Sequence, residues 1–187
     1  MTRVRFVCAV LLFAAAAACG GSAPADTSST PAASGSAAST SASKVVPFER
    51  LQALLPQVDG WTRGEPKGET DTSESVSRVQ VNYEARDQGG LSVEIMDTSA
   101  NRLMLEPMLA MIKSGYESNQ GGTVTKATTV AGFPGYEEWT SESRNGVVGV
   151  LVEGRFTVAV TGSFVPDLAT IRKVANAIDL KKLATLR

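Results

Sequence analysis

The sequence contains no histidine, and both of its cysteines, Cys8 and Cys19, lie near the N-terminus. Catalytic Ser-His-Asp and Cys-His arrangements, histidine acid–base chemistry and zinc sites with histidine or cysteine ligands are therefore excluded beyond Cys19. That part of the chain can form no internal disulfide either, so its stability must come from a hydrophobic core.

An excess of positive charge is also missing, because 18 basic and 19 acidic side chains give a net charge of −1. This balance is unlike the basic surface of nucleic-acid-binding proteins. The phosphate-binding motifs GxxxxGK and GxGxxG are absent, as is the Asp-x-Asp-x-Asp-Gly calcium loop. We therefore expect no nucleic-acid partner and no cofactor.

The first feature that is present is an apolar run of 13 residues, Phe6–Ala18, preceded by Arg3 and Arg5. A helix that spans a bilayer needs roughly 20 such residues. A basic start, a short apolar core and small residues at its end instead predict a secretory signal peptide over residues 1–18.

The end of this segment, Ala16-Ala17-Ala18-Cys19, resembles the lipobox of bacterial lipoproteins. The resemblance implies that Cys19 is acylated with palmitate-type chains, becomes the mature N-terminus and anchors an exported protein. The anchor would lie in the cell membrane or in the outer membrane facing the periplasm, and Gly20 favours the outer membrane. Ala16 departs from the family, which usually has leucine there. This departure leaves ordinary cleavage after Ala18, with a free thiol, as the alternative.

Residues 20–43 consist almost entirely of Gly, Ser, Ala, Pro and Thr. Such a composition cannot bury enough apolar surface to offset the entropy of ordering. We therefore expect residues 19–43 to be a lipidated cysteine followed by a disordered tether, with an end-to-end distance of roughly 25–30 Å. The remaining residues, 44–187, are predicted to form a single domain.

Hydrophobic periodicity in this domain predicts the order helix, two strands, helix, four strands, helix. The helices are expected to begin at Pro47, Pro107 and Pro166 or Asp167, and residues 64–72 to form a polar loop. Strands are expected at 79–85, 91–95, 123–130, 136–143, 147–152 and 156–160. Asn145-Gly146 predicts a hairpin turn. The hairpins favour an α+β fold, with an antiparallel sheet of about five to six strands and two to three packed helices.

Two short segments carry a second resemblance. Gly60-Trp61 follows the first predicted helix, and the pattern Gly-Arg-Phe-x-Val-x-Val occupies residues 154–160. Together with the element order, they resemble the PsbP-like fold of small exported lipoproteins and photosystem accessory proteins. The resemblance implies an accessory or binding role and supplies no catalytic residues.

Methionines are concentrated in one stretch, since four of the five lie between residues 96 and 111. Met104, Met108 and Met111 have the spacing of one helix face, and thioethers are suitable ligands for Cu(I). The same side chains could instead fill the core or line an apolar groove for a small ligand or a partner. With Pro107 as the first helical residue, Met104 would lie before the helix.

Acidic residues form two groups, Glu65, Glu69, Asp71 and Glu74, and Glu137, Glu138 and Glu142. Paired carboxylates can hydrolyse glycosidic bonds, but solvated strand and loop faces also account for these groups. Trp61, Tyr136 and Trp139 could form a sugar-stacking surface, and Arg155 could pair with an acid or an anionic ligand.

These patterns favour a binding or assembly-accessory protein of the cell envelope that is not an enzyme. Its partner would be an envelope protein or a small apolar ligand, bound at a surface that includes Met108, Met111, Trp61 and Trp139. A carboxylate-based glycan hydrolase and a Cu(I)-binding protein are the alternatives.

Overall fold

A computed structural model describes residues 45–99 and 102–187, all of which belong to one compact unit, Thr40–Arg187. The predicted signal peptide, the lipidation site Cys19 and the tether lie outside the described residues.

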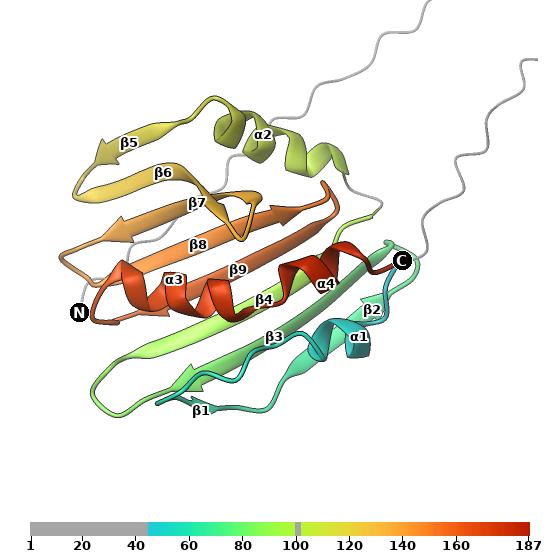
Figure 1. Cartoon of the computed structure of the whole chain (residues 1–187), viewed down its shortest axis with the longest axis horizontal. Helices are drawn as coiled ribbons and strands as arrows, with labels where there is room; N and C mark the ends of the chain where they lie inside the picture. Colours follow the sequence, from blue (N-terminus) through green and yellow to red (C-terminus); the bar gives the residue numbers. More distant parts are fainter. Residues whose placement is uncertain (1–44, 100–101) are drawn as a thin grey trace, which may run out of the picture. The chain divides into compact units, whose positions relative to one another are not determined.

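The described residues form one antiparallel sheet of nine strands (Figure 1). The strands are β1 (Thr62–Arg63), β2 (Lys67–Asp71), β3 (Val76–Glu84), β4 (Gly90–Asp97), β5 (Glu117–Gln120), β6 (Thr123–Val130), β7 (Phe133–Thr140), β8 (Asn145–Val152) and β9 (Phe156–Ser163). Their order is β1-β3-β4-β9-β8-β7-β6-β5, and β2 also pairs with β3. The last strand of the chain, β9, therefore joins the β1–β4 half of the sheet to the β5–β8 half.

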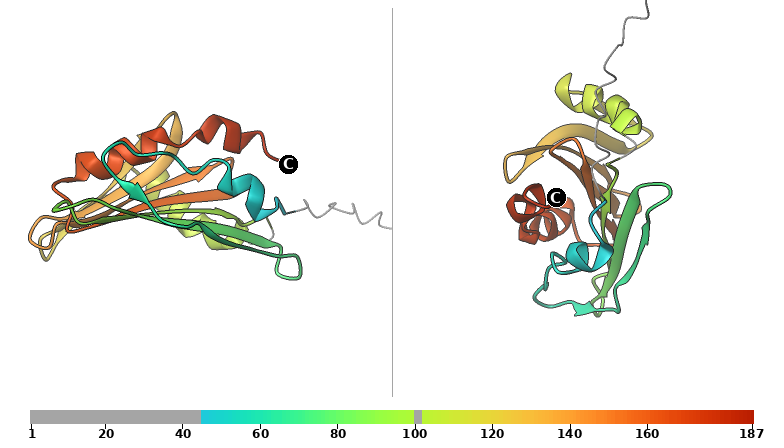
Figure 2. Two further views of the ribbon diagram at one scale, coloured as in Figure 1. Left: turned by 90° about the horizontal axis from the view of Figure 1, so that it is seen from below. Right: turned by 90° about the vertical axis from the view of Figure 1, so that its right-hand side faces the viewer.

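Helices lie on both sides of this sheet. One face is covered by α1 (Phe48–Gln52), α3 (Leu168–Ala177) and α4 (Leu180–Ala184), whereas α2 (Arg102–Lys113) packs on the other side over β6 and β7 (Figure 2). We call the first side the covered face and the second side the open face. No helix within residues 45–99 and 102–187 is long and apolar enough to cross a membrane.

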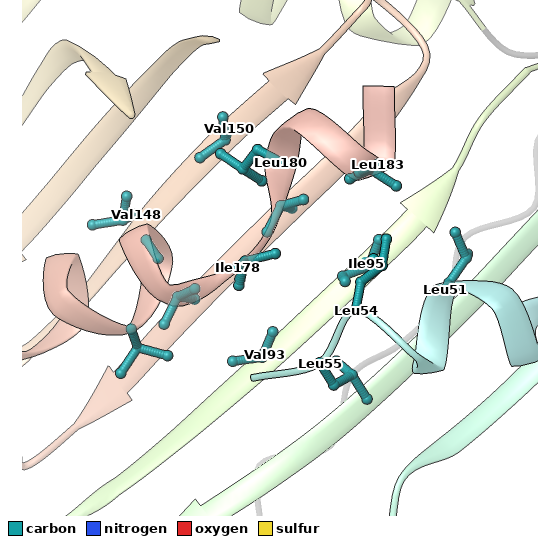
Figure 3. Close-up of a cluster of buried hydrophobic side chains, with 14 of the residues drawn as sticks. Leu51, Leu54, Leu55, Val93, Ile95, Val148, Val150, Ile178, Leu180 and Leu183 are labelled. Atoms are coloured by element: carbon teal, nitrogen blue, oxygen red, sulfur yellow. The ribbon is translucent and has the colours of Figure 1, made fainter. Parts of the chain in front are cut away.

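The core lies between the covered face and the helices α1, α3 and α4. Alternation along β4 directs Leu91, Val93 and Ile95 into it, and all three are buried. Figure 3 shows Val93 and Ile95 against side chains of α1, α4 and the segments beside them. Two glycines allow close packing of α3, because a Cβ atom at Gly162 or Gly146 would lie 2.7 or 3.2 Å from Ile171 Cδ1.

The predicted α+β class and the antiparallel sheet are confirmed, but the sheet has more strands than predicted. The polar loop expected at 64–72 is wrong, because Lys67–Asp71 form β2. Four of these five residues are exposed, so no apolar alternation marks the strand in the sequence. Its existence depends on pairing with β3, from Lys67↔Gln80 to Asp71↔Val76.

The predicted start of the second helix is also wrong. The helix α2 begins at Arg102 rather than at Pro107, and it ends at Lys113. Inside a helix, Pro107 cannot donate to the Leu103 carbonyl and its ring crowds that carbonyl. The Leu103 side chain is 87% exposed, so this turn lies at the surface, where water can replace the lost hydrogen bond. The expectation that Met104 precedes the helix is therefore wrong as well.

Two further boundaries differ from the prediction. The strand β8 already begins at Asn145, and the chain turns at residues 141–144, with Arg144 at a φ of 52°. The Asn145 side chain accepts a hydrogen bond from Phe164 N–H instead of forming a hairpin turn. The last predicted helix is divided into α3 and α4, because Asp179 interrupts it and caps the second segment through Lys182 N–H.

Candidate binding surface

The open face carries polar and small side chains along β3, β4 and β9. In the register of the sheet, Gln80 lies beside Glu94 and Glu94 beside Ala159, and the next row is Asn82, Ser92 and Thr161. In contrast to their neighbours on the covered face, none of these six residues is buried. Among the described helices, α2 is the one on this side, and its main contacts are with β6 and β7.

Two buried carboxylates of the covered face, Asp97 and Glu137, are used in internal pairs. Asp97 is completely buried at the end of β4, and its carboxylate accepts hydrogen bonds from Arg155 Nε at 2.9 Å and Arg155 Nη2 at 2.7 Å. It also accepts Val46 N–H at 2.8 Å, which fixes the start of the described chain to the sheet. Arg155 lies over the Phe156 ring, 4.8 Å from its centroid. Of the two partners predicted for Arg155, an acid or an anionic ligand, the structure therefore shows an acid, and this acid is buried.

A second internal pair connects β7 to α3. Glu137 has 2% of its side chain exposed and accepts hydrogen bonds from Arg172 Nε at 2.7 Å and Arg172 Nη2 at 2.5 Å. Lys126 Nζ lies 3.1 Å from the same carboxylate. Burial raises the pKa of Glu137, but the hydrogen bonds and charges of Arg172 and Lys126 outweigh burial, so the pKa lies below its usual value.

The first acidic group of the sequence has structural roles. Glu69 pairs with Arg78 across β2 and β3. Asp71 Oδ1 accepts hydrogen bonds from the Ser73 hydroxyl at 2.5 Å and from Glu74 N–H at 3.0 Å, and these bonds lower the pKa of Asp71. In the second group, Glu137 and Glu138 are adjacent on β7 and point to opposite faces of the sheet. Glu137 and Glu138 therefore do not face each other, whereas Glu69, Asp71 and Glu74 line one hollow of the sheet.

The four residues predicted to form a binding surface are not brought together. Trp61 and Trp139 are partly buried against the core on the covered side. Met108 and Met111 are half-buried on α2, on the other side of the sheet. The side chain of Met104, the third predicted Cu(I) ligand, lies outside the described residues. Tyr136 also lies away from the tryptophans, because its ring packs over Gly149 on the open face, 2.2 Å from the position of a Cβ atom there.

Shallow hollows lie on the sheet at two places. Three of them, of about 240, 100 and 360 Å³, lie along β2 and β3 and include charged residues such as Lys67, Glu69 and Arg78. The fourth has a volume of about 290 Å³ and lies where β7 and β9 end and β8 begins. It is lined by Glu138, Thr140, Asn145, Gly146, Val147, Thr161, Gly162 and Ser163, and we call it the β7–β9 hollow. Neither Met108 nor Met111 lines any of these four hollows.

An exposed aromatic residue, Phe164, follows the end of β9 that lines the β7–β9 hollow. Phe164 directly follows Ser163, is 61% exposed and has a φ of 57°, in the left-handed region that is unfavourable for a bulky residue. Its N–H donates to Asn145 Oδ1 at 3.1 Å, and Val165 N–H donates to the Arg144 carbonyl at 3.1 Å. Gly89 packs against the same backbone, since a Cβ atom there would lie 2.2 Å from the Ser163 oxygen. The strained conformation is therefore held by neighbouring segments from two sides.

Sequence reasoning missed the β7–β9 hollow and Phe164. The alternation of Val158 and Val160 predicts the orientation of β9, but neither the end of that strand nor the left-handed conformation of Phe164 has a signal in the sequence. Within residues 45–99 and 102–187, no group of three or more Asp, Glu, His or Cys side chains has the geometry of a metal site.

No protein-family model matches this chain, and no curated protein or solved structure is significantly similar to it.

Proposed function

We propose that this protein is a lipid-anchored binding protein of the cell envelope, held through Cys19 and recognising an envelope component with the open face of its sheet. The observation that carries the proposal is the contrast between the two faces of β3, β4 and β9. One face is buried under helices, whereas the other presents polar side chains that no described helix covers. We also propose that the fold is of the PsbP-like type, on the element order and the residues at 60–61 and 154–160.

Three carboxylates, Asp71, Glu137 and Asp167, are poorly suited to act as the acid in glycan hydrolysis. A catalytic acid of this kind needs a carboxyl whose pKa is raised, so that it holds a proton near neutral pH. The pKa shifts of Asp71, Glu137 and Asp167 are all downward, because hydrogen bonds or cations stabilise the charged forms of these carboxylates. Chemistry that depends on a proton held by one of these three groups is therefore disfavoured.

The partner is a surface or a chain rather than a small apolar molecule. The four hollows are shallow and open, with linings that mix polar and apolar atoms, and none of them includes the α2 methionines. A small apolar ligand would instead need an enclosed, mostly apolar pocket.

Sedimentation with isolated cell envelopes tests the binding role. The exported chain carrying Cys19→Ala removes the lipid from the assay and leaves every described residue unchanged. We expect this chain to sediment with envelopes. Ala159→Glu at the centre of the open face should reduce the bound fraction, whereas Lys173→Glu on the exposed side of α3 should not. Equal binding by the two variants would contradict the role of the open face.

The anchor is tested separately by mass spectrometry of the mature N-terminus. We expect Cys19 to be N-terminal and to carry acyl chains, because two chains hold a protein stably at a membrane whereas one holds it marginally. An unmodified Cys19 thiol would remove the anchor from this proposal.

A further inference from the structure

We propose that the β7–β9 hollow, together with Phe164, binds a neutral saccharide chain, so that the envelope component recognised by the open face is a glycan. This inference rests on the function proposed above and names the ligand class for one end of that face.

The lining of the hollow sets the chemistry of its ligand. Glu138, Thr140, Asn145, Thr161 and Ser163 supply hydroxyl, amide and carboxylate groups from three adjacent strands, and the lining includes no Lys or Arg. An anionic ligand would meet the Glu138 carboxylate without a cation to balance it. A ligand rich in hydroxyl groups can both donate to these side chains and accept from them.

Several of these polar groups are available to a ligand. Among the described residues, no hydrogen bond engages the hydroxyl of Thr161, the hydroxyl of Ser163 or Nδ2 of Asn145, although Asn145 Oδ1 holds the Phe164 backbone. Thr140 and Glu138 are already oriented, since Thr140 pairs with Thr123 at 2.7 Å and Glu138 accepts from Thr125 at 3.3 Å. The hollow therefore combines fixed groups with unengaged ones.

The floor of the hollow is the paired backbone of two strands. Gly146 and Gly162 pair with each other there, and a Cβ atom at either position would point to Ile171 on the covered side, not into the hollow. The volume of about 290 Å³ is near the lower limit of roughly 300 Å³ for small-molecule sites, so the hollow suits part of a longer chain rather than a whole enclosed ligand.

In this proposal Phe164 supplies an exposed aromatic ring at the edge of the site, where it follows the lining residue Ser163. A bulky residue in the left-handed conformation is costly, and such strain persists where the surroundings impose it, often at binding sites. Here Asn145 connects the two parts, because it lines the hollow and also fixes Phe164 N–H. An exposed aromatic ring beside hydroxyl and amide groups can contact the C–H face of a sugar ring while the polar groups bind its hydroxyls.

The strain makes stability and binding respond in opposite directions. Asparagine tolerates the left-handed conformation better than phenylalanine does. Phe164→Asn should therefore raise the melting temperature by roughly 2–4 °C and weaken saccharide binding by about tenfold or more. Phe164→Trp retains an aromatic ring and should keep the affinity within about threefold.

The experiment is isothermal titration of the exported Cys19→Ala chain with triacetylchitotriose and with maltotriose, beside thermal melts. The two probes share pyranose rings and differ in the acetamido group, so their comparison identifies the preferred sugar type. Leu103→Asn is the matched control, because it removes an exposed apolar side chain from α2 and should leave binding unchanged.

Failure to bind either probe at about 10 mM would overturn the proposal, as would unchanged affinity in Phe164→Asn. If the chain still sediments with envelopes through the open face while neither probe binds, the saccharide inference falls and the binding role stands with a protein as the partner. If both assays fail, the proposed function falls with it.

Discussion

The two faces of strand β4 differ in burial, although their residues alternate along the same strand. Leu91, Val93 and Ile95 are buried under helices, whereas Glu94 and Met96, one position away along the same strand, are only partly covered. The covered face carries the hydrophobic core and the two buried ion-paired carboxylates, Asp97 and Glu137. Substitutions should therefore change the free energy of unfolding on the covered face and change binding on the open face.

The largest effect is expected at Asp97. Asp97→Asn keeps the shape of the side chain but removes the negative charge that two Arg155 hydrogen bonds and Val46 N–H engage. Removing one partner of a buried pair costs about 3–5 kcal/mol of unfolding free energy. Urea denaturation followed by tryptophan fluorescence measures this loss, and a change below about 1 kcal/mol would contradict the structural role of the pair.

Adjacent residues on β4 give the direct comparison of the two faces. Ile95→Ala should cost about 2–5 kcal/mol, because it deletes buried atoms from the core. Met96→Ala, on the open face, should cost less than about 1 kcal/mol. Equal losses in chemical denaturation would show that the open face is covered in solution and would refute the distinction between the faces.

A smaller, pH-dependent effect is expected at Glu137. Its pKa in the folded state lies below its usual value of 4.5. The contribution of this carboxylate is therefore fully present above that pH and is lost as the pH falls through the folded-state pKa. Because Arg172 and Lys126 are half-exposed, Glu137→Gln should cost only about 1–2 kcal/mol at pH 7.

The pH dependence provides the control for that variant. The stability difference between the wild-type chain and Glu137→Gln should shrink as the pH falls below 4.5, because the wild-type carboxyl then becomes neutral as well. A constant difference from pH 7 to about pH 3 would mean that the variant acts through packing rather than through charge.

The sequence predicts those elements whose apolar residues alternate or repeat. The strands β3, β4 and β9 and the buried positions of α3 follow this rule, and Ile171, Val174 and Ile178 are buried as expected. The edge strand β2 and the short strand β5 are polar, so they form only because a neighbouring strand offers hydrogen bonds. Such tertiary pairing leaves no periodic pattern in the strand itself.

The alternation along β4 also predicts the position of one buried charge. Asp97 continues the alternation of Leu91, Val93 and Ile95, so the spacing alone places it on the covered face, where it needs a cation. Its partner Arg155 follows a glycine turn much later in the chain, and their pairing depends on the contact between β4 and β9. The site at Phe164 was not predictable in this way, because a left-handed backbone conformation has no periodic signal.

Mapping of backbone amide chemical shifts during titration with triacetylchitotriose tests most directly whether the open face binds where β7 and β9 end and β8 begins. We predict shifts at Asn145–Val147 and at Thr161–Phe164, with the amides of α3 and α4 unchanged. Shifts centred on α2 or on the covered side, or no shifts at saturating probe, would contradict the account.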